Sequence, residues 1–139
     1  MIRFTVYGKA EPQGSTRAFI PKGWTRPIIT SDNPKMKSWR QDVTKCCILA
    51  AQKEKEFALP FPKGTAVYVG VIFYFRSPKS AKRSAIGKPT RPDLDKLVRC
   101  ILDAMTGILY EDDSQVAEIN AEKIFDTPEG CYIEVRPKV

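Results

Sequence analysis

The segment Thr65–Phe75 constrains the fold most, because it is apolar on both of its alternating faces. If the segment is extended, successive side chains point to opposite faces. One face consists of Val67, Val69, Val71, Phe73 and Phe75, and the other of Tyr68, Ile72 and Tyr74. A strand of this kind is expected at the centre of a sheet that is covered on both sides. The chain is therefore predicted to build its core around this segment.

Two other segments have the periodicity of amphipathic helices. The first uses Asn33 as its cap and Pro34 as its first residue, and its apolar stripe consists of Met36, Trp39, Val43, Cys46 or Cys47, and Ala50. The second stops at Gly107, and its apolar face consists of Leu94, Leu97, Val98, Ile101 and Met105. Because Trp39 lies on the first stripe, we interpret it as a core residue and not as a base-stacking platform.

Alternating residues predict the remaining strands. These are an opening strand over 2–7, short extended pieces near 17–21 and 26–30, and two closing strands over 116–125 and 131–136 joined by a turn at 127–130. With 139 residues, the chain forms one domain, 1–139. The predicted fold is α+β, with a mixed, mostly antiparallel sheet and two main helices packed on it.

Composition excludes several classes of function. The sequence has no histidine, so serine–histidine and cysteine–histidine nucleophiles are impossible. Its four cysteines form no CxxC pair, which favours buried free thiols over a zinc site or disulfides. No stretch reaches the ~20 apolar residues of a membrane span, and the N-terminus does not resemble a secretory signal. We therefore expect a cytoplasmic protein with no membrane partner.

Charge is unevenly distributed along the chain. Residues 1–92 hold 18 Lys and Arg against 5 Asp and Glu, whereas residues 93–139 hold 5 against 11. A basic body favours a polyanionic partner such as DNA. The loop 76–91 lies between the central strand and the acidic region, and it contains no Asp or Glu. We therefore predict that its Lys and Arg side chains, together with parts of residues 9–40, bind phosphate groups. The candidate DNA contacts are Arg76, Lys79, Lys82, Arg83, Lys88, Arg91 and Lys96.

The acidic region offers two groups of carboxylates. Pro92 biases the preceding residue towards extended geometry, so Asp93 and Asp95 straddle a loop-to-helix junction where both can face one ligand. The alternative is that Asp93 only caps the helix and Asp95 only favours its dipole. Three consecutive acids, Glu111, Asp112 and Asp113, follow the same helix, and their repulsion demands a cation or raised pKa values.

Together the two groups supply oxygen ligands without nitrogen or sulfur, as Mg²⁺ or Mn²⁺ prefers. A divalent ion would reverse the repulsion between these acids and a phosphate, and it would activate water. Asp103 lies four residues after Arg99, a spacing at which it can orient the guanidinium. The pattern indicates metal-dependent hydrolysis of phosphodiester bonds.

The run from 91 to 116 resembles the signature of the RusA-type Holliday junction resolvases. That family carries D-x-D-N-L-x-K, then D-A-L, then D-D-x-Q-V, which here fall on Asp93–Arg99, Asp103–Met105 and Asp112–Val116. The resemblance implies a homodimeric endonuclease that cuts four-way DNA junctions in recombination and repair with Mg²⁺, or Mn²⁺ as a substitute. Its essential carboxylates fall on Asp93, Asp95 and Asp113, with Asp112 as a further candidate ligand.

Two positions in the first motif depart from the family signature. The family lysine falls on Arg99, which keeps the charge but does not readily give up a proton. Lys96 replaces the family asparagine and offers an amine close by, although an exposed lysine in a first helical turn is ordinary. Two alternatives stay open: an inactive protein that binds junctions or duplex DNA, and a structural cation site without a nucleic-acid role.

Overall fold

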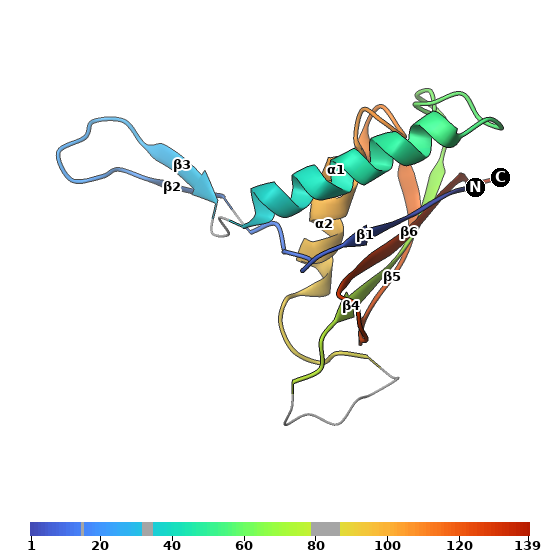
Figure 1. Ribbon diagram of the computed structural model, residues 1–139. Helices are drawn as coiled ribbons and strands as arrows, with labels where there is room; N and C mark the ends of the chain where they lie inside the picture. The colour runs from blue at the N-terminus through green and yellow to red at the C-terminus, as the bar shows by residue number, and fades with distance from the viewer. Residues whose placement is uncertain (15, 32–34, 79–86) are drawn as a thin grey trace.

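A four-stranded sheet with two helices on one of its faces forms the body of the protein (Figure 1). The computed structural model describes residues 1–14, 16–31, 35–78 and 87–139. The elements are β1 (Ile2–Tyr7), β2 (Thr16–Phe19), β3 (Ile28–Ser31), α1 (Met36–Lys53), β4 (Val67–Phe75), α2 (Leu94–Met105), the 3₁₀ turn η1 (Asp113–Gln115), β5 (Val116–Phe125) and β6 (Gly130–Pro137). The strand order is β1-β6-β4-β5, and β2 and β3 pair separately.

Strand β4 is an inner strand of the sheet, as its two apolar faces predict. It pairs in antiparallel fashion with β6 and in parallel with β5, while β1 pairs in antiparallel fashion with β6. The sheet is thus mixed and mostly antiparallel, and the α+β prediction is confirmed. The face of β4 beneath the helices is fully buried, with Val67, Val69 and Phe73 all inaccessible to solvent.

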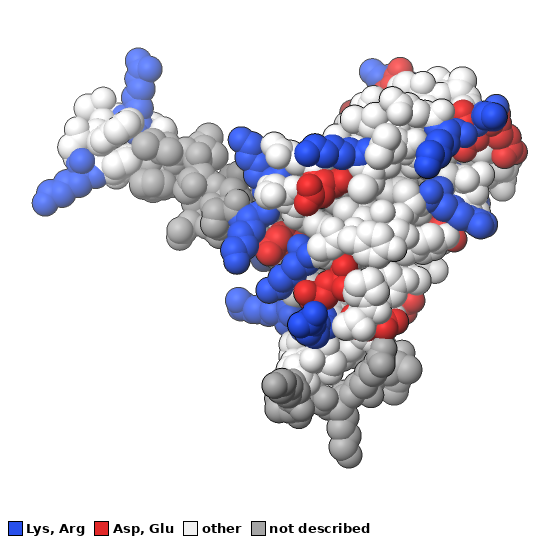
Figure 2. Space-filling model, in the orientation of Figure 1, with Lys and Arg blue, Asp and Glu red and all other residues white. Residues whose placement is uncertain are grey.

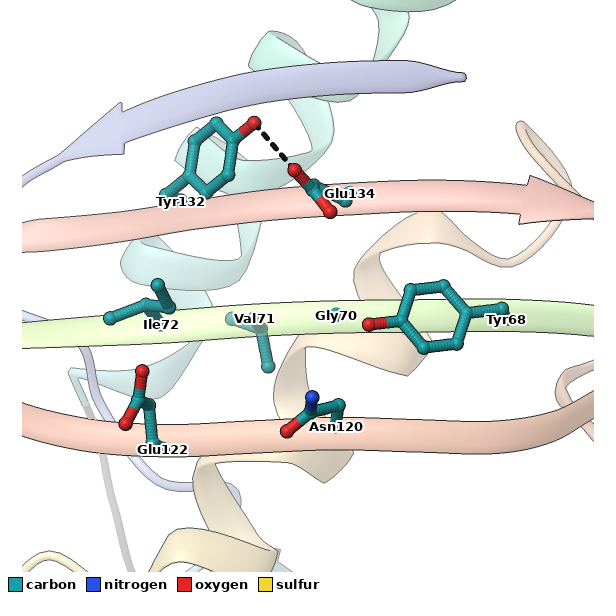
Figure 3. Close-up of a pocket in the computed structure, with 8 residues that line it drawn as sticks. All are labelled: Tyr68, Gly70, Val71, Ile72, Asn120, Glu122, Tyr132 and Glu134. Atoms are coloured by element: carbon teal, nitrogen blue, oxygen red, sulfur yellow. Dashed lines mark hydrogen bonds between the residues drawn. The ribbon is translucent and has the colours of Figure 1, made fainter.

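The prediction that β4 is covered on both sides is wrong. Both helices lie on one face of the sheet, so Tyr68, Ile72 and Tyr74 are only half-buried on the other (Figure 1). Figure 3 shows this open face, where Tyr132 donates a hydrogen bond to Glu134 at 2.9 Å. The sequence pattern is misleading here because tyrosine counts as apolar, although its hydroxyl is polar and suits a partly exposed face.

The predicted helical stripes are confirmed. In α1 the residues Met36, Trp39, Val43 and Cys47 are buried, and Trp39 is a core residue that is 3% exposed. Helix α1 begins at Met36, and the predicted cap at Asn33 and Pro34 lies outside the described residues. In α2 the buried face includes Leu97, Val98, Ile101 and Met105, and the chain leaves the helix before Gly107, whose φ is +85°.

Strands β5 and β6 are consecutive in sequence but lie on opposite sides of β4. The turn at 127–130 therefore carries the chain across the end of β4 instead of joining neighbouring strands. Gly130 packs so closely against β1 that an added Cβ would lie 2.2 Å from the carbonyl oxygen of Val6. This turn fixes β6 between β1 and β4.

All four cysteines are free thiols, as predicted; Cys47, Cys100 and Cys131 are buried and Cys46 is half-buried. In the part of the chain that the structure describes, no helix has the length and apolar character needed to cross a membrane.

Candidate active site between α2 and β5

A groove with a volume of about 650 Å³ runs between helix α2 and the edge strand β5. This volume is within the range of ligand clefts in proteins. The groove is lined by Leu94, Asp95, Val98, Arg99, Leu102, Asp113, Ile119 and Ala121. Three of the residues singled out in the sequence, Asp95, Arg99 and Asp113, therefore share one cleft, although helix α2 separates the first from the last along the chain.

Asp93 stands at the start of α2 in an extended conformation, with φ −69° and ψ 132°. Its side chain makes no capping hydrogen bond, so the interpretation that Asp93 only caps the helix is not supported. Instead, the Asp93 carboxylate lies 3.7 Å from the ammonium of Lys96, and both side chains are largely exposed. Asp93 is not among the residues that line the groove.

Asp112 and Asp113 are adjacent but have different surroundings. The Asp112 carboxylate accepts a hydrogen bond from the Ser114 N–H at 2.8 Å and so caps η1. This bond holds the pKa of Asp112 below its ordinary value. Partial loss of water, together with the neighbouring Asp112 and Asp103, raises the pKa of Asp113. Asp113 is thus the carboxylate that turns to the groove, in a locally negative field.

Gln115 fixes the acidic turn to the rest of the protein. Its side-chain oxygen accepts hydrogen bonds from the N–H groups of Glu111 and Asp112 at 2.9 and 3.0 Å. Its amide nitrogen donates to the carbonyl oxygens of Phe61, Pro62 and Thr65 at 3.0 to 3.2 Å. The glutamine of the acidic motif therefore anchors Asp113 and does not face the groove.

Lys123 anchors the other carboxylate segment and was not identified from the sequence. Its ammonium donates hydrogen bonds to the carbonyl oxygens of Thr90 and Pro92, the latter at 2.6 Å. Pro92 directly precedes Asp93, so a lysine on β5 holds the start of α2 in place. No local pattern could indicate this contact, because 31 residues separate the two partners.

A second residue missed in the sequence, Gln13, forms two hydrogen bonds with helix α2. Its amide nitrogen donates to the Asp103 carboxylate at 2.7 Å, and its backbone N–H donates to the carbonyl oxygen of Lys96 at 3.0 Å. Within the described ranges Asp103 forms no ion pair with Arg99, and their pairing stays a prediction. Gln13 follows Pro12 in a stretch that the sequence marks only as a break after β1.

Comparison with known proteins identifies the family. The sequence model of the family Endodeoxyribonuclease RusA matches residues 9–136, which is most of the chain. The chain belongs to the RusA endodeoxyribonuclease family. The resemblance inferred from the motif between 91 and 116 is thus confirmed, and the matched region includes the groove, η1 and the sheet apart from β1 and the last residue of β6.

The chain is also similar to two individual proteins. The "Uncharacterized protein YqaN" of Bacillus subtilis (strain 168) is 29% identical over 145 residues, covering 97% of this chain and 95% of that protein. The "Crossover junction endodeoxyribonuclease rusA" of Lactococcus phage r1t is 36% identical over 76 residues, covering 54% of this chain and 57% of that protein. The chain is similar to both along much of its length.

The basic residues predicted to bind DNA in this RusA-family chain divide into three groups. Arg76 and Arg91 are exposed, and Lys96 is occupied with Asp93. Lys88 packs its ammonium over the rings of Phe75 and Phe125 and donates to the Thr90 hydroxyl at 2.7 Å. Lys79, Lys82 and Arg83 lie outside the described residues. Lys and Arg side chains gather on the side of the body nearest the β2–β3 hairpin (Figure 2).

Among the described residues, no three Cys, Asp or Glu side chains are close enough together to hold a metal ion. The carboxylates selected by the sequence motif nevertheless lie near one helix: Asp95 and Asp113 line the groove, and Asp93, at the start of α2, lies 3.7 Å from Lys96. The donor set consists of carboxylates alone, and partial loss of water, together with the nearby carboxylates of Asp112 and Asp103, raises the pKa of Asp113. Both features fit a hard divalent cation.

Proposed function

We propose that this RusA-family chain is a Holliday junction resolvase, an endodeoxyribonuclease that hydrolyses phosphodiester bonds in four-way DNA junctions during recombination and repair. The observation that carries the proposal is the groove in which Asp95, Arg99 and Asp113 meet. Family membership and the name of the phage relative support the same reaction and substrate. The alternative of an inactive junction-binding protein has no observation in its favour.

Asp93, Asp95 and Asp113 are the proposed ligands of Mg²⁺, with Mn²⁺ as a substitute. When bound, such an ion supplies Lewis-acid polarisation of the scissile phosphate and an activated water. Asp112 is less suited to this role than Asp113, because one of its oxygens already caps η1. Lys96 lies close enough to Asp93 to neutralise it while no ion is present.

Arg99 is the proposed phosphate-binding cation of the site. Its guanidinium keeps its charge at any physiological pH and presents several donors in one plane, so it stabilises a developing phosphate charge but does not act as a base. Asp103 and Gln13 are proposed as positioning residues on the adjoining side of α2, because their 2.7 Å hydrogen bond ties the segment after β1 to this helix.

DNA is proposed to approach across the basic surface around the start of α2. Arg76 and Arg91 are exposed there, and burial, together with Lys123 and Lys9, lowers the pKa of Lys88. Clustered positive charge of this kind attracts a phosphate backbone. Lys79, Lys82 and Arg83 belong to the same proposal on the basis of sequence alone. The whole chain, 1–139, is proposed as one cytoplasmic endonuclease domain.

A homodimer is proposed because symmetric cutting of a junction requires two sites related by a two-fold axis. The open face of the sheet supports this arrangement, since it presents Tyr68, Ile72 and Tyr132, all half-buried, around a hollow of about 160 Å³ (Figure 3). The basic side chains of this face already have partners within the protein: Arg3 lies 3.8 Å from Glu134, and Arg136 lies over the Tyr68 ring. Such a face suits a second protein surface better than it suits phosphate.

Cleavage of a synthetic four-way junction tests the proposed function. The expected result is symmetric nicking that requires Mg²⁺ or Mn²⁺ and stops with EDTA, while a linear duplex made from the same arms stays intact. Tight binding without cleavage at any divalent ion would establish the inactive junction-binding protein instead. Absence of any salt-sensitive DNA affinity would leave only the structural cation site.

A further inference from the structure

The β2–β3 hairpin is a separate element of the molecule. Its two strands pair only with each other, Thr16 opposite Ser31 through Phe19 opposite Ile28. The hairpin projects away from the sheet and helices, and its tip is the part farthest from the body (Figure 1). None of the residues that line the groove between α2 and β5 belongs to it. An arm that leaves the body in this way adds surface without adding to the core.

The tip of this arm, residues 20–27, exposes two large apolar side chains. Ile20 is 61% exposed and Trp24 is 59% exposed, whereas Trp39, the other tryptophan, is 3% exposed. A turn in which the Trp24 N–H donates to the Pro21 carbonyl oxygen at 2.9 Å supports the tip. Exposed tryptophan is uncommon on a surface that binds nothing, because its ring carries a large hydrophobic area.

The charge of the tip restricts what can cover Trp24. Lys22 and Arg26 flank it and are both exposed, and the sequence from 12 to 31 contains no Asp or Glu. A basic surface without acids favours a polyanion over a neutral protein surface. Aromatic side chains set among bases are the arrangement by which proteins stack on nucleobases while holding the backbone.

We propose that Trp24 stacks on a base pair exposed at the branch point of the DNA junction while Lys22 and Arg26 bind the adjacent phosphates. The inference rests on the proposed function and adds the element that distinguishes branched from linear DNA. In a continuous duplex each base pair is stacked between two neighbours. An indole can stack on it only after a base step has been unstacked, which costs free energy. At a branch point the end of a helical arm offers an aromatic face without that cost.

Tryptophan fluorescence tests this inference directly, because Trp24 is accessible and Trp39 is buried. The experiment uses the full chain carrying Asp113→Asn, so that the DNA is bound and not cut. Addition of a four-way junction is expected to quench the emission and to protect it from acrylamide, whereas a linear duplex of the same arms has little effect. The Trp24→Phe variant reports Trp39 alone and is expected to show neither change.

Binding measurements give the energetic counterpart. Trp24→Ala is expected to weaken junction binding about 10-fold relative to duplex binding, because stacking contributes about 1–3 kcal/mol per base. Trp24→Phe retains an aromatic face and is expected to retain most of the preference. Lys22→Ala and Arg26→Ala are expected to weaken the binding of both DNAs and to lower the salt dependence of that binding. Lys55→Ala, which removes an exposed charge from the body, is the matched control.

Two results would overturn the inference: an unchanged junction-to-duplex ratio in Trp24→Ala, or Trp24 emission that the junction does not affect. A change in oligomeric state in Trp24→Ala, with DNA affinity unaltered, would assign the tip to a partner subunit and would also overturn it. If the unaltered chain neither binds nor cuts junctions, the proposed function itself fails. Normal cutting with an unresponsive Trp24 removes only the role of the hairpin.

Discussion

The ammonium of Lys123 donates a 2.6 Å hydrogen bond to the carbonyl oxygen of Pro92, the residue directly before Asp93. The same group binds the carbonyl oxygen of Thr90, so one side chain on β5 holds the segment that leads into α2. Because β5 also forms one wall of the groove, Lys123 couples the two sides of the proposed active site.

Replacement of Lys123 by methionine is therefore expected to lower junction cleavage at least 10-fold while junction binding changes little. The two carbonyl groups lose a charged donor, which is expected to reduce the free energy of unfolding by about 1.5–3 kcal/mol. Cleavage rates measured as a function of Mg²⁺ concentration check the positioning role, since a misplaced Asp93 should raise the metal concentration required. Lys123→Arg should restore part of the rate; equal loss in both variants would argue against it.

Gln115 is expected to be as important for the acidic turn as Lys123 is for the start of α2. Gln115→Leu leaves two N–H groups and three carbonyl oxygens without their side-chain partner. A loss of about 1–3 kcal/mol in unfolding free energy is expected, together with strongly reduced cleavage. Ser114→Ala, whose backbone N–H still binds Asp112, is the matched control in urea unfolding and cleavage assays. An unaltered Gln115→Leu protein would contradict the anchoring role.

The elements whose residues follow a local period could be predicted from the sequence. Both helices, the opening strand, β4 and the two closing strands have nearly the predicted bounds, because side-chain alternation and helical spacing depend on neighbours in the chain. The position of β6 between β1 and β4 could not be predicted in this way. It depends on the close packing of Gly130 against Val6, which no pattern within β5 or β6 encodes.

The residues of the candidate site likewise divide into those that a local motif indicates and those that only the tertiary structure reveals. Asp95 and Asp113 could be selected from the motif, and the structure brings them to one groove. Gln13 and Lys123 were missed because each acts through a partner distant in sequence, Asp103 and Pro92 respectively. Single polar residues of this kind have no periodicity, so only the tertiary fold distinguishes them from ordinary surface residues.

The buried thiols predict a loss of stability at high pH. Burial raises the pKa of Cys47 from 9.0 to about 12 and that of Cys100 from 9.0 to about 11. The unfolded chain releases these protons near pH 9 and the folded chain does not, so stability present below pH 9 is lost as pH rises towards 11–12. The expected slope is up to about 1.4 kcal/mol per pH unit for each thiol.

Urea unfolding between pH 8 and pH 10.5 measures this slope. Cys47→Ala is expected to be less stable at pH 8, through lost packing, but to lose less stability as the pH rises than the unaltered chain. Parallel curves for the two proteins would contradict the role assigned to the Cys47 thiol. Thiol titration at pH 8 should detect Cys46 before the three buried cysteines react.

The proposed dimer predicts that the open face of the sheet is sensitive to charge. Ile72 is half-buried there and pairs in register with Glu122 on β5, so Ile72→Lys gains a neighbouring carboxylate and should leave the subunit folded. The substitution is expected to weaken dimerisation at least 10-fold in sedimentation equilibrium. Ile48→Lys, at a position on α1 that is 41% exposed, is the matched control. Equal masses for all three proteins would place the interface elsewhere.

The two adjacent aspartates give the sharpest test of the active site, because they differ in surroundings but not in chemistry. Asp113→Asn removes a proposed metal ligand from the groove, so cleavage should fall at least 1000-fold while junction binding is kept or tightened by the lost repulsion. Asp112→Asn retains an oxygen that can cap η1, since asparagine is also a good cap, and should keep most of the cleavage and the unfolding free energy.

Cleavage and junction affinity measured side by side decide between the two carboxylates. If Asp112→Asn abolishes cleavage and Asp113→Asn does not, the metal ligand is the capping residue and the assignment is reversed. Loss of a metal ligand that has no structural role should leave the DNA-binding surface intact. An equal loss of junction binding and cleavage in Asp113→Asn would therefore assign Asp113 a role in folding.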